Sequence, residues 1–259
     1  MPSQPPLLFL HGAFAGPEIW TRFVAPWFAR RGRVVSAPRL APPGARGVRL
    51  RALVAAARAA ADALEAPPVL IGHSLGGLVA QHLAAERRVA GLILVAAPGP
   101  FGLGPSLWRL SARHPRVLAA LMLTQIGGGG LLGVEAARRA LFTEDTPEDW
   151  IAEVAPVPRP ESPQALFDGL TWDWPVWPLV RRSPVLALLG DRDAFIPVSD
   201  LAAIALSYGA RTEILHGMAH GAPIDPRWLR LAWAIETWLQ EREALEAGKA
   251  DAAVGRLTE

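Results

Sequence analysis

The chain has 259 residues, of which 51% are hydrophobic and 19% charged, and this length suffices for one large hydrophobic core. The formal net charge is only +2 and the arginines are scattered rather than gathered in a stripe, so the sequence gives no indication of a nucleic-acid partner. There is no cysteine, which excludes a disulfide framework, a thiol nucleophile and a cysteine metal site.

The first six residues have neither the basic region nor the apolar run of a secretory signal peptide. The segment Val117–Val134 comes closest to the length of a membrane-spanning helix, but the four glycines Gly127–Gly130 interrupt it. We therefore expect a cytoplasmic protein without an integral membrane segment. The sequence does not indicate an oligomeric state.

Short apolar runs alternate with helical patterns along most of the chain. Strands are predicted at Leu7–Leu10, Val34–Ala37, Val69–Ile71, Leu92–Val95, Val185–Leu189 and Glu213–Leu215. Helices are predicted at Pro17–Arg31, at Arg49–Leu64, at Gly77–Ala85 and after each of the last two strands. Near-continuous apolar strands separated by helices are typical of a mostly parallel sheet covered on both faces, so we predict an α/β fold.

The alternation is interrupted between residues 101 and 178, a segment too long for a single crossover. It carries two basic helical patches, a proline-rich stretch and a tryptophan-rich run, at Trp108–Met122, Val134–Leu141, Pro156–Pro163 and Trp172–Trp177. We predict a helical cap inserted over the carboxyl ends of the strands, where open α/β sheets bind ligands. A longer connection that carries core tryptophans is the alternative.

The predicted domain organisation follows from this interruption. Residues 1–100 and 179–243 form the core, residues 101–178 form the cap insertion, and residues 244–259 form a C-terminal tail that is expected to fray.

The stretch Gly72-His73-Ser74-Leu75-Gly76 stands between a predicted strand and a predicted helix. A G-x-S-x-G at a strand-to-helix turn holds its serine in a strained conformation, with the hydroxyl exposed over the end of a sheet. The flanking glycines are needed because neighbouring elements crowd so tight a turn. Ser74 is therefore the candidate nucleophile, and a glycine-rich loop that merely contains a serine is the alternative.

A serine nucleophile needs a base, and the base needs an acid to orient it. On this kind of sheet the acid and the histidine follow the serine in that order. Asp191 and Asp193 come directly after the fifth predicted strand. We predict Asp193 as the acid, because an aspartate at a strand exit, such as Asp191, often bonds the turn backbone instead.

Two histidines compete for the role of the base. His220 lies in a loop of small residues that can bring its ring to the rim of the sheet, whereas His216 stands at the end of the last predicted strand. We predict His220 as the base and a structural role for His216.

Acyl transfer also requires hydrogen-bond donors directed at the developing oxyanion. One donor on this architecture is the backbone N–H after the nucleophile, which belongs to Leu75. The loop after the first strand reads His11-Gly12-Ala13-Phe14, and we predict the Ala13 N–H as the second donor. His11 is expected to brace this loop rather than to react.

These motifs together resemble those of the α/β-hydrolase superfamily, and of a serine esterase or lipase-like member with a helical cap. They are His11-Gly12-Ala13-Phe14, Gly72-His73-Ser74-Leu75-Gly76-Gly77, Gly190-x-x-Asp193-x-x-Ile196-Pro197 and Gly217-x-x-His220. The resemblance covers residues 7–240 and implies Ser74, Asp193 and His220 as the triad, with Ala13 and Leu75 as the oxyanion hole. Because the chain begins almost at the strand that is usually third, we expect about six parallel strands.

Ten tryptophans against one tyrosine point to a hydrophobic substrate, since pockets for acyl or aromatic groups are lined mainly by apolar surface. The predicted partner is a small-molecule hydrophobic ester. Candidate contacts are Phe14, Trp108, Trp150 and Trp174, with ordinary packing as the alternative for each tryptophan. The sequence has no H-E-x-x-H, P-loop or Rossmann fingerprint, so we expect neither a metal nor a cofactor.

The function predicted from these residues is hydrolysis of a hydrophobic carboxylic ester through an acyl-enzyme. A serine rather than an aspartate at the elbow argues against dehalogenation. The same triad also supports hydrolysis of a carbon–carbon bond, a lactone or a thioester, or cofactor-free perhydrolysis. A non-enzymatic ligand receptor is the alternative from another functional class.

Overall fold

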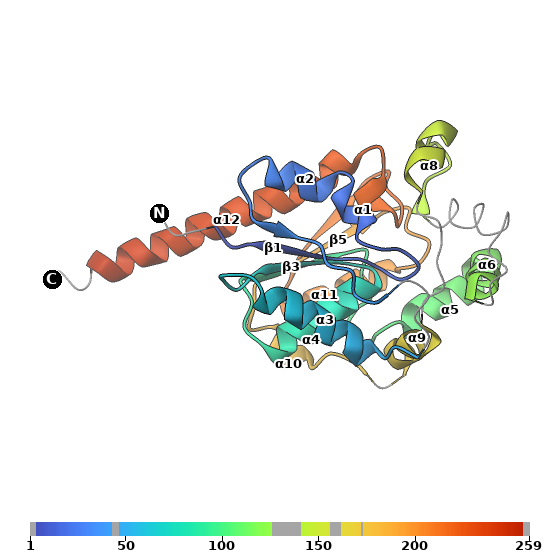
Figure 1. Cartoon of the computed structure of the whole chain (residues 1–259), viewed down its shortest axis with the longest axis horizontal. Coiled ribbons are helices and arrows are strands. Elements are labelled where there is room, and N and C mark those ends of the chain that lie inside the picture. Colours follow the sequence, from blue (N-terminus) through green and yellow to red (C-terminus); the bar gives the residue numbers. More distant parts are fainter. Residues whose placement is uncertain (1–3, 43–46, 126–140, 156–161, 172, 256–259) are drawn as a thin grey trace.

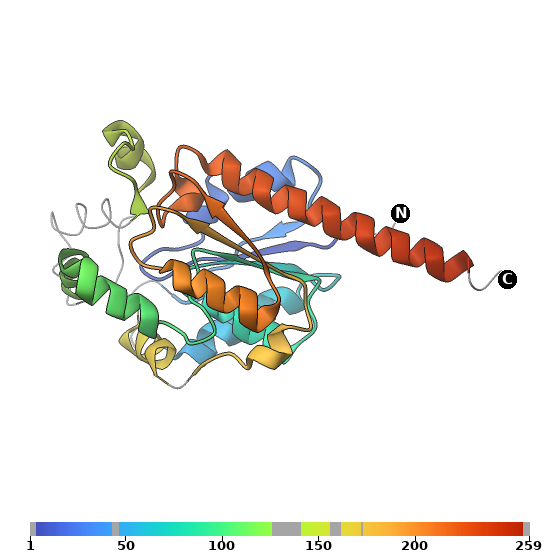
Figure 2. The same cartoon turned by 180° about the vertical axis from the view of Figure 1, so that it is seen from behind.

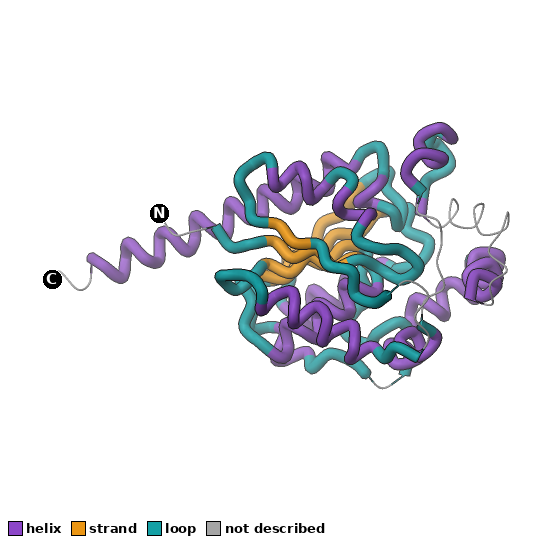
Figure 3. Tube along the Cα trace, in the orientation of Figure 1, coloured by secondary structure: helices purple, strands orange, loops and turns teal. Residues whose placement is uncertain are grey.

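The structure is a computed structural model that describes residues 4–42, 47–125, 141–155, 162–171 and 173–255. Its centre is a parallel sheet of six strands in the order β2-β1-β3-β4-β5-β6. The strands are β1 (Leu7–Leu10), β2 (Val35–Ser36), β3 (Val69–His73), β4 (Gly91–Val95), β5 (Val185–Gly190) and β6 (Arg211–Leu215). Figure 1 and Figure 3 show the sheet as one layer between two layers of helices.

Helices cover both faces of the sheet. One face carries α1 (Glu18–Thr21), α2 (Val24–Ala29) and α12 (Trp228–Gly255), and the other carries α3 (Leu50–Asp62), α4 (Leu75–Glu86), α10 (Trp177–Val180) and α11 (Val198–Tyr208) (Figure 1, Figure 2). Every residue of β1, β3, β4 and β5 is buried, as strands covered on both faces require. The predicted α/β class and the parallel six-stranded sheet are confirmed.

The strand order reverses direction beside β1, since β2 lies on one side of it and β3 on the other. In doubly wound sheets, ligands bind outside the carboxyl ends of the strands at such a switch point. The loop after β1 and the turn after β3 both lie there. The topology therefore brings together the two segments that the sequence analysis assigns to the oxyanion hole and the nucleophile.

The predicted helix over residues 17–31 is wrong as a single element. The structure has α1 and α2, separated at Phe23, whose φ and ψ are −132° and −60°. Pro26 explains the break, because a proline ring in a continuous helix would clash with the carbonyl four residues earlier, that of Arg22. The other predicted strands are present with shifts of a few residues at their ends, as are the predicted helices at Arg49–Leu64, at Gly77–Ala85 and after the last two strands. The predicted helical patch Trp108–Met122 is divided at His114 between two helices.

The C-terminal helix is longer than the sequence analysis expects. Residues 244–259 are predicted to fray, whereas α12 continues as a helix to Gly255 and projects beyond the sheet (Figure 1, Figure 2). Alanine and glutamate favour the helix here, and Glu246 pairs with Arg242 and Lys249 at 3.2 and 2.8 Å, at helical spacings of four and three residues. Local interactions thus extend α12 past its contacts with the core.

The segment 101–178 contains α5 (Gly104–Arg113), α6 (Pro115–Gln125), α8 (Glu148–Val154) and α9 (Pro163–Leu170), followed by the start of α10. Figure 1 shows α5, α6 and α8 at the end of the sheet opposite to the projecting end of α12. The described residues do not include Trp172 or most of the predicted segments Val134–Leu141 and Pro156–Pro163. None of the helices that the structure describes combines the length and apolar character needed to span a bilayer.

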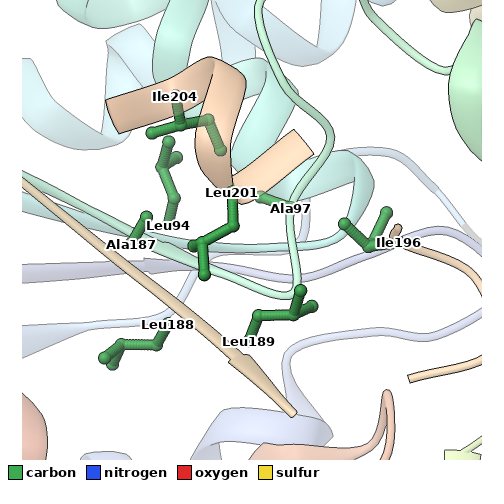
Figure 4. Close-up of a pocket in the computed structure, with 8 residues that line it drawn as sticks. All are labelled: Leu94, Ala97, Ala187, Leu188, Leu189, Ile196, Leu201 and Ile204. Carbon is green, nitrogen blue, oxygen red and sulfur yellow. The ribbon is translucent and has the colours of Figure 1, made fainter. Parts of the chain in front are cut away.

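A small apolar void lies between β4, β5 and α11 (Figure 4). Its lining is formed by Leu94, Ala97, Ala187, Leu188, Leu189, Ile196, Leu201 and Ile204. The void has no room for a water molecule and no polar side chain in its lining, so it belongs to the packing of the core and is not a ligand site.

Candidate active site

Ser74 occupies the turn between β3 and α4 with φ 52° and ψ −124°, a backbone conformation that residues other than glycine rarely adopt. Such a conformation costs about 1–3 kcal/mol and persists only where the surroundings enforce it. Here the Ser74 N–H donates to the carbonyl of Val95 at 3.1 Å, and its own carbonyl accepts from the Gly77 N–H at 2.8 Å. Ser74 is also partly exposed, whereas its neighbours His73 and Leu75 are buried.

The glycines around Ser74 let backbone segments approach closely. A Cβ atom at Gly76 would lie 2.4 Å from the carbonyl oxygens of both His11 and Leu10, at the end of β1. A Cβ atom at Gly72 would lie 2.5 Å from the Gly76 carbonyl oxygen. The elbow is therefore packed backbone to backbone against β1, and no side chain fits between them.

We expect Gly76→Ala to lower the free energy of unfolding by about 3 kcal/mol or more, because the clash is with backbone that cannot rotate away. Gly248→Ala is the matched control, since nothing lies within 4 Å of a Cβ there. Urea unfolding of both variants measures the difference. Equal stability of Gly76→Ala and the wild-type chain would contradict the backbone packing described here.

The loops after β5 and β6 meet in a buried aspartate–histidine pair. Asp193 Oδ2 lies 2.8 Å from His220 Nδ1, and both side chains are at least nine-tenths buried. The other oxygen, Oδ1, accepts the N–H groups of Phe195 and Ile196 at 2.7 and 2.9 Å. The carboxylate is thus held from two sides, and an Nδ1–H donated to it leaves His220 Nε2 as a proton acceptor.

Asp191 and His216 form a second pair, separate from the first. Asp191 Oδ1 accepts the Gly217 N–H at 2.8 Å, and Oδ2 lies 3.2 Å from Nδ1 of His216, whose side chain is 81% exposed. The structure therefore places Asp193 and His220 together in a buried position, and it places Asp191 on the turn backbone and on an exposed histidine. This arrangement agrees with the preference for Asp193 and His220.

His73, to which the sequence analysis assigns no role, links the elbow to the histidine loop. Its Nε2 donates to the carbonyl of His220 at 2.8 Å, and the two rings have centroids 4.8 Å apart. Burial, with a further contribution from the charge of His220, lowers the pKa of His73 to about 3. A neutral His73, which directly precedes Ser74, therefore holds the main chain of His220 close to the elbow.

The pKa of His73 predicts acid sensitivity of the fold. The unfolded chain binds the proton below about pH 6.5, whereas the folded chain binds it only near pH 3. The contribution of His73 to the free energy of unfolding is thus complete above pH 6.5 and falls with the pH, by about 2–3 kcal/mol at about pH 4.5.

Urea unfolding at neutral and acidic pH measures this loss of stability, with His73→Gln as the comparison variant. We expect the variant to lose less stability on acidification, because glutamine does not titrate. A loss as large as that of the wild-type chain would contradict the titration of His73.

The loop after β1 is braced by His11, as expected from the sequence. His11 Nδ1 donates to the carbonyl of Gly12 at 2.9 Å, and Nε2 accepts the Leu40 N–H at 3.1 Å. Burial lowers the pKa of His11, in agreement with this neutral arrangement. Phe14, in the same loop, has φ 61°.

The two predicted oxyanion donors lie at backbone positions suited to that role. Ala13 lies in the loop at the end of β1, against which the elbow packs. Leu75 is the first residue of α4, where an N–H group has no carbonyl of the helix to bond and is therefore available to an anion.

The aromatic residues predicted to contact substrate have different surroundings. Trp108 on α5 is 72% exposed, and Trp174 is half-exposed with its ring 6.1 Å from that of Phe101. Trp150 stacks on Phe23 at 5.4 Å and donates its indole N–H to the carbonyl of Ile224. None of the ring contacts in the described chain joins two of the predicted substrate residues, and Trp150 has an evident packing role.

In the part of the chain that the structure describes, no group of three or more histidine, aspartate or glutamate side chains is placed to hold a metal ion.

Comparison with known proteins agrees with these features. A model of the alpha/beta hydrolase family matches residues 7–232. A pimeloyl-(acyl-carrier protein) methyl ester esterase of Aromatoleum aromaticum is 34% identical over 119 residues, which cover 40% of this chain and 47% of that protein. The chain thus matches about half the length of this curated relative.

Solved structures extend the similarity to nearly the whole chain. BpoC from Mycobacterium tuberculosis superimposes with a TM-score of 0.72 at 19% identity, and the alignment covers 93% of each of the two chains. A thermophilic esterase from Thermogutta terrifontis gives 0.69 at 23% identity, covering 92% of this chain and 90% of the esterase. At these identities the likeness establishes the fold.

Proposed function

The chain belongs to the alpha/beta hydrolase family, and from this premise we propose that it hydrolyses hydrophobic carboxylic esters through an acyl-enzyme. In this proposal Ser74 is the nucleophile, His220 the general base and Asp193 the acid that orients it. The observation that carries the proposal is the buried Asp193–His220 pair. The main chain of His220 is hydrogen-bonded to His73, which directly precedes the strained and partly exposed Ser74.

The proposed reaction begins when Ser74 Oγ attacks the ester carbonyl while His220 Nε2 accepts the hydroxyl proton. Asp193 stabilises the imidazolium that forms, and the N–H groups of Ala13 and Leu75 donate to the oxyanion. His220 then returns the proton to the leaving alcohol. Water, activated in the same way, attacks the acyl-enzyme and releases the acid and free Ser74.

We further propose that residues 101–178 form a cap over this site and that the substrate is uncharged. The carboxyl ends of the strands face α5, α6 and α8, which is where a cap has to lie (Figure 1). The curated relative is named as a methyl ester esterase, which favours an ester among the bonds this triad can cleave. Phe14, Trp108, Trp150 and Trp174 stay predicted substrate contacts, although the Trp150 ring is already stacked on Phe23.

Turnover of p-nitrophenyl esters from acetate to octanoate tests the proposal. We expect hydrolysis that depends on acyl length, with no added metal or cofactor. If no ester is hydrolysed, the ester proposal is wrong, and lactone, thioester and carbon–carbon substrates become the next panel. Stoichiometric binding of a ligand without any turnover would instead support a receptor.

A further inference from the structure

The turn that carries Asp193 has two sides with different partners. Its inner side presents the carboxylate to His220, and the same carboxylate accepts the backbone N–H groups of Phe195 and Ile196. The position of the carboxylate is therefore tied to the position of this short backbone segment. Any element that holds the segment from outside also sets the distance between Asp193 and His220.

Arg109 of α5 holds the outer side of this turn. Its Nη2 donates to the carbonyl of Asp193 at 3.2 Å, and its Nε donates to the carbonyl of Ala194 at 3.3 Å. The rigid fork of a guanidinium suits two adjacent acceptors. Between residues that the structure describes, Arg109 forms no ion pair, and its guanidinium donates to these two carbonyls.

A second contact joins the same turn to the same helix. The Phe195 ring lies 4.5 Å from the ring of His220. It also packs against the small apolar cluster of Leu110 on α5 and Val117 on α6. Phe195 therefore stands between the imidazole and the two helices, and it transmits their position by packing while Arg109 does so by hydrogen bonds.

We infer that Arg109 is a positioning residue for the acid–base pair. By holding the carbonyls of Asp193 and Ala194, it makes the orientation of His220 depend on the position of α5. This inference rests on the proposed function for its catalytic consequence. It adds a connection by which the segment over the strand ends controls the site beneath it.

The test compares Arg109→Met with Arg113→Met, a substitution one turn later on the same helix at an exposed position. We expect kcat for an ester substrate to fall about 10–100-fold in Arg109→Met, with little change in KM, because the reacting groups are misplaced while the substrate contacts are kept. Arg109→Lys should restore part of the rate. Arg113→Met should behave like the wild-type chain.

We expect the short Asp193–His220 hydrogen bond to give a strongly downfield proton resonance in the wild-type chain, which is a readout independent of turnover. It should broaden or disappear in Arg109→Met and stay in Arg113→Met. Unchanged kcat and an unchanged resonance in folded Arg109→Met, or equal losses in both variants, would overturn the inference. If Arg109→Met does not fold, Arg109→Lys decides by the same readouts, with wild-type values overturning the inference.

These measurements separate the inference from the proposed function. A wild-type chain that hydrolyses no ester refutes the proposed function, while the resonance still reports whether Arg109 holds the pair. A wild-type chain that hydrolyses esters at a rate indifferent to Arg109 refutes only the inference.

Discussion

Replacement of Ser74 by alanine is expected to lower kcat/KM for an ester by about 10⁴–10⁶-fold, since removal of a serine nucleophile leaves only binding and oxyanion stabilisation. The fold should survive, because the Ser74 side chain makes no hydrogen bond to the helix that it precedes. Steady-state hydrolysis and a thermal melt of the purified variant measure the two effects. Retained activity in a pure preparation would exclude Ser74 as the nucleophile.

The companion variant Ser74→Gly separates strain from chemistry. It should be as inactive as Ser74→Ala, yet more stable, because glycine adopts φ 52° and ψ −124° without the steric cost that alanine shares with serine. The expected gain over Ser74→Ala is about 1–3 kcal/mol in urea unfolding. Equal stability of the two variants would mean that the elbow stores no strain.

Asp193→Asn is the second variant with a large expected effect, a fall in kcat of about 10⁴-fold. The asparagine carbonyl oxygen can still accept the N–H groups of Phe195 and Ile196, so the turn keeps its backbone bonds. Its amide, however, donates to His220 Nδ1 and thereby fixes the tautomer that cannot accept the serine proton at Nε2.

Asp191→Asn is the matched control for this substitution. Asp191 bonds the Gly217 N–H and the exposed His216, and an asparagine oxygen retains the first of these bonds. Its kcat should stay close to that of the wild-type chain. A larger loss in Asp191→Asn than in Asp193→Asn would exchange the roles of the two aspartates.

The positions of the strands could be predicted because a strand that is buried on both faces consists almost entirely of apolar residues. Leu7–Leu10 and Gly91–Val95 are buried on both faces, so their residues are continuously apolar and the pattern is plain in the sequence. The break between α1 and α2 was less visible, although Pro26 is its physical signal. The length of α12 depends on local propensity and ion pairs, which composition alone understates.

The site was predictable in its motifs but not in its contacts. One loop carries two neighbouring aspartates and another carries two neighbouring histidines, so the sequence leaves the pairing open. Only the folded turns show that Asp193 contacts His220 while Asp191 contacts His216. The role of His73 was missed for a similar reason. Its hydrogen bond reaches a residue 147 positions away, and nothing in the local sequence indicates that partner.

The helices over the strand ends show the same limit. Arg109 looks like one of several basic residues on a solvated helix, and its contact with the turn at Asp193 depends on how α5 lies over the sheet. Trp20, one of the ten tryptophans that together suggested a hydrophobic substrate, lies instead in the core. It is fully buried against Phe9 and donates its indole N–H to the carbonyl of Leu10.

Intact-protein mass spectrometry after treatment with a fluorophosphonate tests the central claim, that Ser74 is a nucleophile activated by His220 and Asp193. We expect one covalent adduct per chain, located on the peptide that contains Ser74, and no adduct in Ser74→Ala. Labelling should be strongly slowed in Asp193→Asn and near normal in Asp191→Asn. A wild-type chain that takes no label, or that takes it at another residue, would contradict the account.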